Sequence, residues 1–136
     1  MPLIEWTDRM SVGVEALDSD HQRLIGLLNQ LDAIIQGTES EAALPGLVHE
    51  LVRYTTYHFA SEERMMRLAR YPGLDEHLRA HTDLRRRIVS FEQKFLTAPG
   101  TAADAVPLFE FLSEWLTRHI LQEDMRYRPY MVKESA

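Results

Sequence analysis

The stretch HFASEE at residues 58–63 places a histidine and a glutamate four residues apart within a helical pattern. Four residues turn an α-helix by about 400°, so His58 and Glu62 lie one turn apart on one face. Leu51, seven residues before His58, shares that face. Buried polar groups cost free energy unless something pairs with them. The stretch therefore predicts a helix whose inward face carries metal ligands.

Histidines also fall on the apolar stripe of three other helical segments. One His on an apolar stripe is usually a hydrogen-bonded core residue, and a single pair spaced by four is a weak signal. Recurrence on four helices favours a shared metal site, because imidazole and carboxylate are good transition-metal ligands. The residues expected to face inward together are His21, His58, Glu62, His77, His81, His119 and Asp124.

Asp124 fits this pattern least well. It follows His119 by five residues, which leaves the two side chains about 140° apart on a regular helix. For both to reach one site, the helix must end, widen or bend between Leu121 and Asp124. The Arg128-Pro129 pair favours an ending nearby.

His49 is the histidine that the pattern excludes. It lies nine residues before His58, or about 900° around a helix, and therefore points to the opposite side. We expect it to face solvent and to have no role in the site.

Turn signals divide the chain into four helical segments. Asp18 is a candidate N-cap and Gly37 a candidate C-cap of the first segment, and Pro72-Gly73 ends the second. Strand signals are absent, so the sequence predicts an all-α fold, an antiparallel up-down-up-down four-helix bundle forming a single domain. Trp6 and Leu3 are candidates to anchor an N-terminal arm. The expected parts are an arm at 1–17, helices at about 18–36, 40–70, 74–96 and 104–123, and a short C-terminal segment at 124–136.

Composition excludes several classes of function. The chain has 136 residues, 45% of them hydrophobic and 26% charged, which is typical of one globular domain. It has no cysteine, which excludes disulfides, thiolate zinc sites and iron–sulfur clusters. Its net charge of -6 argues against nucleic acid as the main ligand. Without a membrane-length apolar run or a signal peptide, we expect a cytoplasmic protein that does not insert into membranes.

The number of ligands predicts two metal ions. Seven protein ligands exceed what one tetrahedral or octahedral ion uses, whereas two ions bridged by Glu62 and Asp124 use all seven. If one ion takes three histidines and the other two, two bridging carboxylates and a solvent-derived bridge give six ligands and five. One open position remains, which suits a small diatomic ligand. Ligand type alone leaves iron, zinc, copper and manganese open.

These pieces resemble the hemerythrin family, in its single-domain bacterial form (bacteriohemerythrin). The likeness covers nearly the whole chain, and no ligand position of the family pattern is missing. Its combination is specific, although no single piece would be. The matching pieces are Trp6, Gly13, Asp18-x-x-His21, His58-Phe-x-x-Glu62-Glu63, His77-x-x-x-His81 and Trp115-Leu116-x-x-His119-Ile120-x-x-x-Asp124-x-x-Tyr127.

The resemblance implies a non-haem di-iron centre that binds dioxygen reversibly, for storage, delivery or scavenging. In it, three histidines hold a six-coordinate iron and two hold a five-coordinate iron that binds dioxygen. Glu62, Asp124 and a solvent-derived oxo or hydroxo group bridge the pair. The six-coordinate iron would take His77, His81 and His119, the five-coordinate iron His21 and His58, and the oxygen pocket Phe59, Trp115, Leu116 and Ile120.

Other functions remain open at this point. A di-iron enzyme of the peroxidase or ferroxidase type typically uses Glu-x-x-His pairs, and this sequence contains none. Sensing of oxygen, nitric oxide or redox state needs an output domain, which a partner protein would have to supply. A metal store or zinc-bound structural bundle would leave the open position unexplained. We expect a monomeric, non-enzymatic oxygen binder that supplies an oxygen-consuming partner enzyme.

Overall fold

The computed structural model describes residues 4–97 and 101–135, which form helices and connecting turns without a strand. The all-α prediction is therefore confirmed. In chain order the elements are η1 (Asp8–Met10), α1 (Glu15–Ile35), η2 (Glu41–Ala43), α2 (Leu44–Leu68), α3 (Leu74–Thr97), α4 (Ala102–Arg118), η3 (His119–Asp124) and α5 (Met125–Ser135). The elements η1 and η2 are 3₁₀-helices, whereas η3 is a π-helix.

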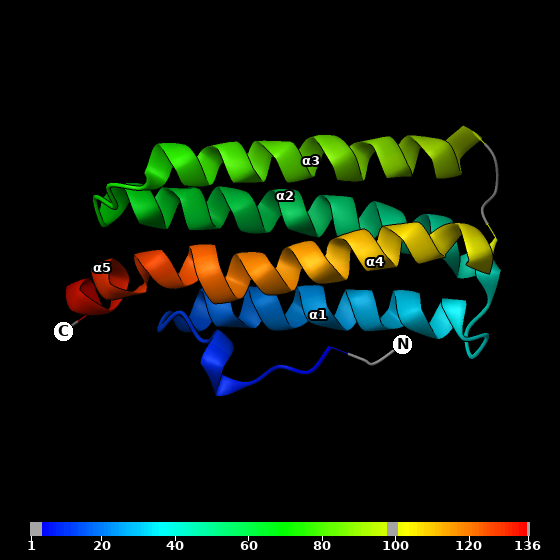
Figure 1. The fold of residues 1–136 in the computed structure, drawn as a ribbon, viewed down its shortest axis with the longest axis horizontal. Coiled ribbons are helices and arrows are strands. Elements are labelled where there is room, and N and C mark those ends of the chain that lie inside the picture. Colours follow the sequence, from blue (N-terminus) through cyan, green and yellow to red (C-terminus); the bar gives the residue numbers. More distant parts are fainter. Residues whose placement is uncertain (1–3, 98–100, 136) are drawn as a thin grey trace.

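The four long helices lie side by side as a bundle, with α5 extending beyond the end of α4 (Figure 1). Helix α2 contacts α1 and α3, and α1 also contacts α4. Consecutive helices are joined by short connections and run in opposite directions, as Figure 1 shows. The prediction of a four-helix bundle is confirmed.

Two apolar clusters lie on either side of a polar layer. The main core contains buried residues of all four long helices, and a smaller end cluster consists of Val12, Leu17, Met66, Tyr127 and Met131. On α1, His21 falls between Leu17 of the end cluster and Leu24 of the main core. Burying each large apolar side chain of these two clusters contributes about 1.5–3 kcal/mol to the stability of the fold. The end cluster therefore closes the polar layer from the end of the bundle.

Two helices end in the same hydrogen-bonded motif. After α1, Gly37 has φ of 84°, its N–H donates to the Ile34 carbonyl, and the Thr38 N–H donates to the Ala33 carbonyl. This is a Schellman motif, whose left-handed residue is usually glycine. After α2, Arg70 holds the corresponding position with φ of 56°.

The start of α1 differs from the prediction. The helix begins at Glu15 after Val14, so Asp18 is not its N-cap. Instead the Asp18 carboxylate accepts hydrogen bonds from the Ser11 hydroxyl at 2.6 Å and from the Val12 N–H at 2.8 Å. Asp18 therefore ties the arm to the helix from inside the first turns.

The C-terminal segment also differs from the prediction. Residues expected to form a short segment after the helix continue as η3 and then α5, and the helix passes through Pro129. The start of α4 shifts as well: it begins at Ala102, because Thr101 and Asp104 form a capping box. Predictions from local turn residues therefore misplace both the start of α4 and the end of the last helical segment.

The N-terminal arm runs beside α1 (Figure 1). The Asn29 side chain accepts from the Ile4 N–H at 3.1 Å and donates to the Ile4 carbonyl at 2.9 Å. Trp6 is partly buried against the main core, as expected of an anchor. Leu3 lies outside the described residues.

Within residues 4–97 and 101–135, no helix combines the length and apolar character needed to cross a bilayer.

Substituting Arg70 by glycine is expected to stabilise the protein by about 1 kcal/mol, since a left-handed conformation costs a side-chain-bearing residue roughly that much. Urea unfolding of the variant would measure the change. Gly37→Ala is the matched control and should lower stability by a similar amount, because Gly37 also has positive φ. No atom lies within 4 Å of the added Cβ, so the backbone conformation alone would account for the change. A destabilised Arg70→Gly variant would contradict the prediction.

Candidate metal centre

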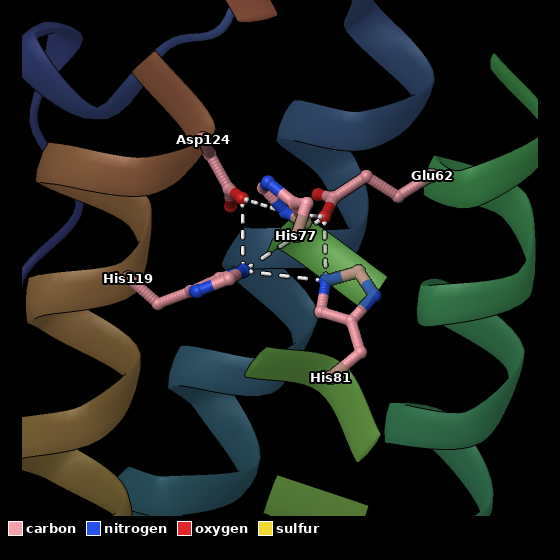
Figure 2. Close-up of side chains that lie close together, drawn as sticks. All are labelled: Glu62, His77, His81, His119 and Asp124. Carbon is pink, nitrogen blue, oxygen red and sulfur yellow. Dashed lines mark hydrogen bonds and ion pairs between the residues drawn. The ribbon is translucent and has the colours of Figure 1, made fainter. Parts of the chain in front are cut away.

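All seven predicted ligands converge in the polar layer between the two clusters. Each is at least 96% buried. Figure 2 shows Glu62 of α2, His77 and His81 of α3, His119 and Asp124 pointing toward a common centre. His21 of α1 and His58 of α2 complete the set. His49 lies apart: its side chain is 67% exposed, and its Nδ1 is 3.0 Å from Glu92 Oε2.

The potential ligand atoms fall into two groups that share Glu62. Within each group, every residue offers one nitrogen or carboxylate oxygen, and these atoms all lie within 4.8 Å of one another. The groups are Glu62, His77, His81, His119 and Asp124, and His21, His58 and Glu62.

Glu62 divides its two oxygens between the histidine groups. Its Oε1 is 2.9 Å from His77 Nε2 and 3.0 Å from His81 Nε2. Its Oε2 is 3.4 Å from His21 Nε2 and 3.2 Å from His58 Nε2. One carboxylate therefore faces both halves of the site.

Asp124 is divided in the same way. Its Oδ1 is 3.0 Å from the Nε2 atoms of His77 and His119, and its Oδ2 is 3.1 Å from His21 Nε2. The two carboxylates together span a three-histidine half and a two-histidine half.

The π-helix η3 explains how Asp124 reaches the site. It spans the six residues from His119 to Asp124. A π-helix closes hydrogen bonds between residues five apart, so the wider turn brings positions i and i+5 to one side. Of the three possibilities expected from the spacing, which were ending, widening or bending of the helix, the structure shows widening.

Carboxylates outside the centre face the Nδ1 atoms of three histidines. His58 Nδ1 hydrogen-bonds to Asp20 at 3.0 Å, and His81 Nδ1 hydrogen-bonds to Glu63 at 2.8 Å.

His119 Nδ1 lies 3.0 Å from Glu123 Oε2. An ionised carboxylate only accepts hydrogen bonds, so the protons of the His58 and His81 imidazoles are on Nδ1. In the neutral ring the Nε2 lone pair then faces inward.

Hydrogen bonds between the inward atoms satisfy only some of them. His77 Nε2 hydrogen-bonds to Glu62 Oε1 at 2.9 Å, whereas His119 Nε2 and His81 Nε2, 3.3 Å apart, can form a hydrogen bond only if one of these nitrogens carries a proton. His21 Nδ1 and Nε2, His119 Nδ1 and both Asp124 oxygens are buried without a hydrogen bond of favourable geometry, despite the short distances to neighbours. Convergent acceptors require cations between them. The donor set of five imidazoles and two carboxylates fits transition-metal ions.

The hemerythrin HHE cation binding domain matches residues 12–131. The chain belongs to the hemerythrin family. A bacteriohemerythrin from Stenotrophomonas maltophilia (strain R551-3) is 33% identical over 93% of this chain and 80% of that protein. A myohemerythrin from Riftia pachyptila is 34% identical over 90% of this chain and 89% of that protein. A crystal structure of wild-type hemerythrin shares the fold, with a TM-score of 0.82 at 24% identity, covering 96% of this chain and 99% of that one.

Hemerythrins bind oxygen at a di-iron centre, and this chain has the cluster of histidine and carboxylate side chains suited to it. The family assignment made from sequence motifs is confirmed. The iron cofactor fits the unsatisfied acceptor atoms found in this structure.

Opposite charges shift the titration of the hemerythrin ligands in the metal-free protein. Burial disfavours the charged forms of His21 and His77, but contacts with Asp124 and Glu62 outweigh burial and raise the pKa of each to about 9. Burial alone would raise the pKa of Glu62, yet His58 and the other histidines hold it well below its usual value. Protons therefore occupy the site when metal does not.

An apolar cavity of about 20 Å³ lies within the main core. This exceeds the roughly 10–15 Å³ needed for a water-sized molecule. The cavity is lined by Leu24, Leu28, Leu51, Thr55, Phe59, Leu84, Leu112, Trp115 and Leu116. Three of the four predicted pocket residues are among them, whereas Ile120 is fully buried in the main core and does not line the cavity.

Two aromatic rings join the cavity to the ligands. Phe59 stacks on His81 with ring centroids 3.7 Å apart, and Trp115 stacks on His119 at 4.3 Å. Because these rings form part of the cavity wall, the cavity lies against the ligand layer.

Sequence reasoning assigned no role to the residues around the ligands. Tyr127 donates its hydroxyl proton to Glu62 Oε2 at 2.9 Å, and Asp20, Glu63 and Glu123 face the histidines. Glu123 follows His119 by four residues, a spacing that helical periodicity can detect. Asp20 pairs with a histidine of another helix, so no local signal exists for it.

The metal-free protein should lose stability as pH rises from 6.5 to about 9. His21 and His77 have folded pKa values above the unfolded value of 6.5, so their contribution is complete below pH 6.5 and disappears as pH rises through about 9. Thermal unfolding after chelation would show a falling Tm over this range. The metal-loaded protein should lack this decline, because metal binds the deprotonated ligands. A rising Tm in the chelated protein would contradict the assignment.

Proposed function

We propose that this chain binds dioxygen reversibly at a di-iron centre, for storage, delivery or scavenging. One iron is held by the three-histidine group and the other by the two-histidine group, with Glu62 and Asp124 bridging them. The division of both carboxylates between the two groups carries this proposal, because each carboxylate directs one oxygen toward each histidine group, as a bridge between two ions requires.

The unequal histidine count gives the two irons different coordination. If both carboxylates and a solvent-derived bridge were shared, the three-histidine iron would be saturated and the two-histidine iron would keep one position. When bound, the iron pair supplies the electrons that dioxygen takes up and returns.

The chain orients its ligands from outside the centre. The carboxylates on Nδ1 of His58 and His81 direct Nε2 inward, and the Tyr127 hydroxyl fixes the rotamer of Glu62. Tyr127 is itself fully buried in the end cluster. The ligands are therefore preorganised without contact with bulk water.

The apolar cavity, which lies against the ligand layer, limits the access of water and protons to the centre. Its wall carries Phe59, Trp115 and Leu116, and none of its lining residues is charged. A dry pocket protects a bound dioxygen from the protonation that would release it in reduced form. The pocket thus favours reversible binding over oxidation.

We further propose that the chain acts as a binder rather than an enzyme. Among the residues that the structure describes, two carboxylates face the centre, and all seven inward ligands would be used in holding metal. Few anionic ligands give little stabilisation to high-valent iron. Anaerobic reduction followed by a screen for oxidation of ferrous iron or peroxidase substrates would test this, and turnover of either would contradict it.

The reduced, iron-loaded protein should bind two irons and be colourless without oxygen. It should gain a visible absorption band in air and lose it under vacuum. His58→Ala should impair loading of the two-histidine iron and abolish the band, whereas His49→Ala, which alters an exposed histidine, should leave the spectrum unchanged.

Two results would reject the proposal. One is a protein that takes up two zinc ions but no iron. The other is irreversible oxidation of the iron-loaded protein without a visible oxygenated form.

Phe59→Ala should speed loss of the oxygenated form by about tenfold, because removing the phenyl ring enlarges the cavity and admits water to the ligand layer, where Phe59 lies against both His81 and His58. The decay of the visible band in air would measure it. Phe109→Ala is the matched control, since Phe109 is buried in the same core but does not line the cavity. Equal decay in both variants would show that the effect comes from general destabilisation.

A further inference from the structure

The two histidines of the two-histidine group have different surroundings. His58 Nδ1 hydrogen-bonds to Asp20, whereas His21 Nδ1 is buried without a hydrogen bond. A carboxylate outside the centre therefore hydrogen-bonds to this half of the site through His58.

Asp20 is also the most shielded of the three carboxylates outside the centre that face a ligand histidine. Its side chain is 10% exposed, compared with 37% for Glu123. Glu63 is similarly buried at 12%, but Arg85 lies 3.8 Å from it and offsets its charge. A buried, unshared charge acts more strongly on its neighbour than an exposed or paired one.

Tyr54 fixes Asp20 against His58. The Tyr54 hydroxyl donates to Asp20 Oδ1 at 2.9 Å, and His58 Nδ1 pairs with Asp20 Oδ2 at 3.0 Å. Tyr54 and His58 are one turn apart on α2, and Asp20 precedes His21 on α1. Each carboxylate oxygen thus has its own donor, and the contact joins two helices.

We propose that Asp20 is a positioning residue that sets the electron donation of His58 to the two-histidine iron, and with it the reduction potential and oxygen affinity. This inference rests on the proposed di-iron function. A carboxylate that accepts the Nδ1–H gives the ring partial imidazolate character and strengthens its Nε2 as a donor. A stronger donor stabilises the ferric state of the iron that binds dioxygen.

The test is Asp20→Asn, which keeps the shape of the side chain and removes its charge. We expect the midpoint potential to rise by about 59 mV, which corresponds to a tenfold change in a one-electron couple. Oxygen affinity should fall about tenfold. In a cobalt(II) titration, the weaker of the two binding steps should weaken by about 10–100-fold. Asp20→Glu should restore the potential in part.

The second variant, Tyr54→Phe, distinguishes an electronic effect of Asp20 on the reduction potential from a general loosening of the contact between Asp20 and His58. Loss of the tyrosine donor leaves a more basic carboxylate, so the potential should fall instead of rise. Opposite shifts in Asp20→Asn and Tyr54→Phe support the proposal, whereas shifts of the same sign overturn it. Asp8→Asn, the same charge change at an exposed residue of η1, should leave the potential unchanged.

Failures of the two proposals are distinguishable in the unmodified protein. A normal reversible oxygenated form, combined with an unchanged potential in Asp20→Asn, would overturn only the role of Asp20. An unmodified protein that forms no oxygenated species would overturn both.

Discussion

The crowding of metal-binding atoms at one buried layer is the constraint on which the rest of the structure depends. Five imidazoles and two carboxylates aim acceptor atoms at each other across distances of about 3 Å. Such atoms repel unless protons or metal ions lie between them. The bundle can hold them together because apolar clusters pack on both sides of the layer, and their burial opposes that repulsion. Packing of the fold therefore holds the ligands in a binding site that they would not form by themselves.

The two halves of the ligand layer differ in their histidines, in the aromatic rings stacked on them and in the carboxylates around them. Three histidines face one half and two the other, and the aromatic stacking of Phe59 and Trp115 falls on His81 and His119 of the three-histidine half. On the two-histidine half, only His58 has a carboxylate on its outer nitrogen. The two halves of the layer therefore have different surroundings, although Tyr127 hydrogen-bonds to Glu62, whose two oxygens face both halves.

Predictions from sequence were accurate where one helix sufficed to make them. His58 and Glu62, or His77 and His81, share a face because four residues nearly complete a turn, whatever the other helices do. His49 was placed in solvent by the same rule. Errors arose at helix boundaries. Asp18 has the chemistry of an N-cap, yet its carboxylate binds the arm, and Pro129 does not end the last helix.

The sequence by itself determined the fold class, the family and the identity of the inward-facing residues, since helical periodicity and ligand chemistry are properties of the chain alone. Tertiary structure decided how Asp124 enters the site, because the spacing of five residues left ending, widening and bending of the helix open, and the structure has a π-helix there. It also decided which carboxylate oxygen faces which histidine and that Asp20 meets His58. These contacts join different helices, and the distance between two helices depends on packing that no spacing along one of them encodes.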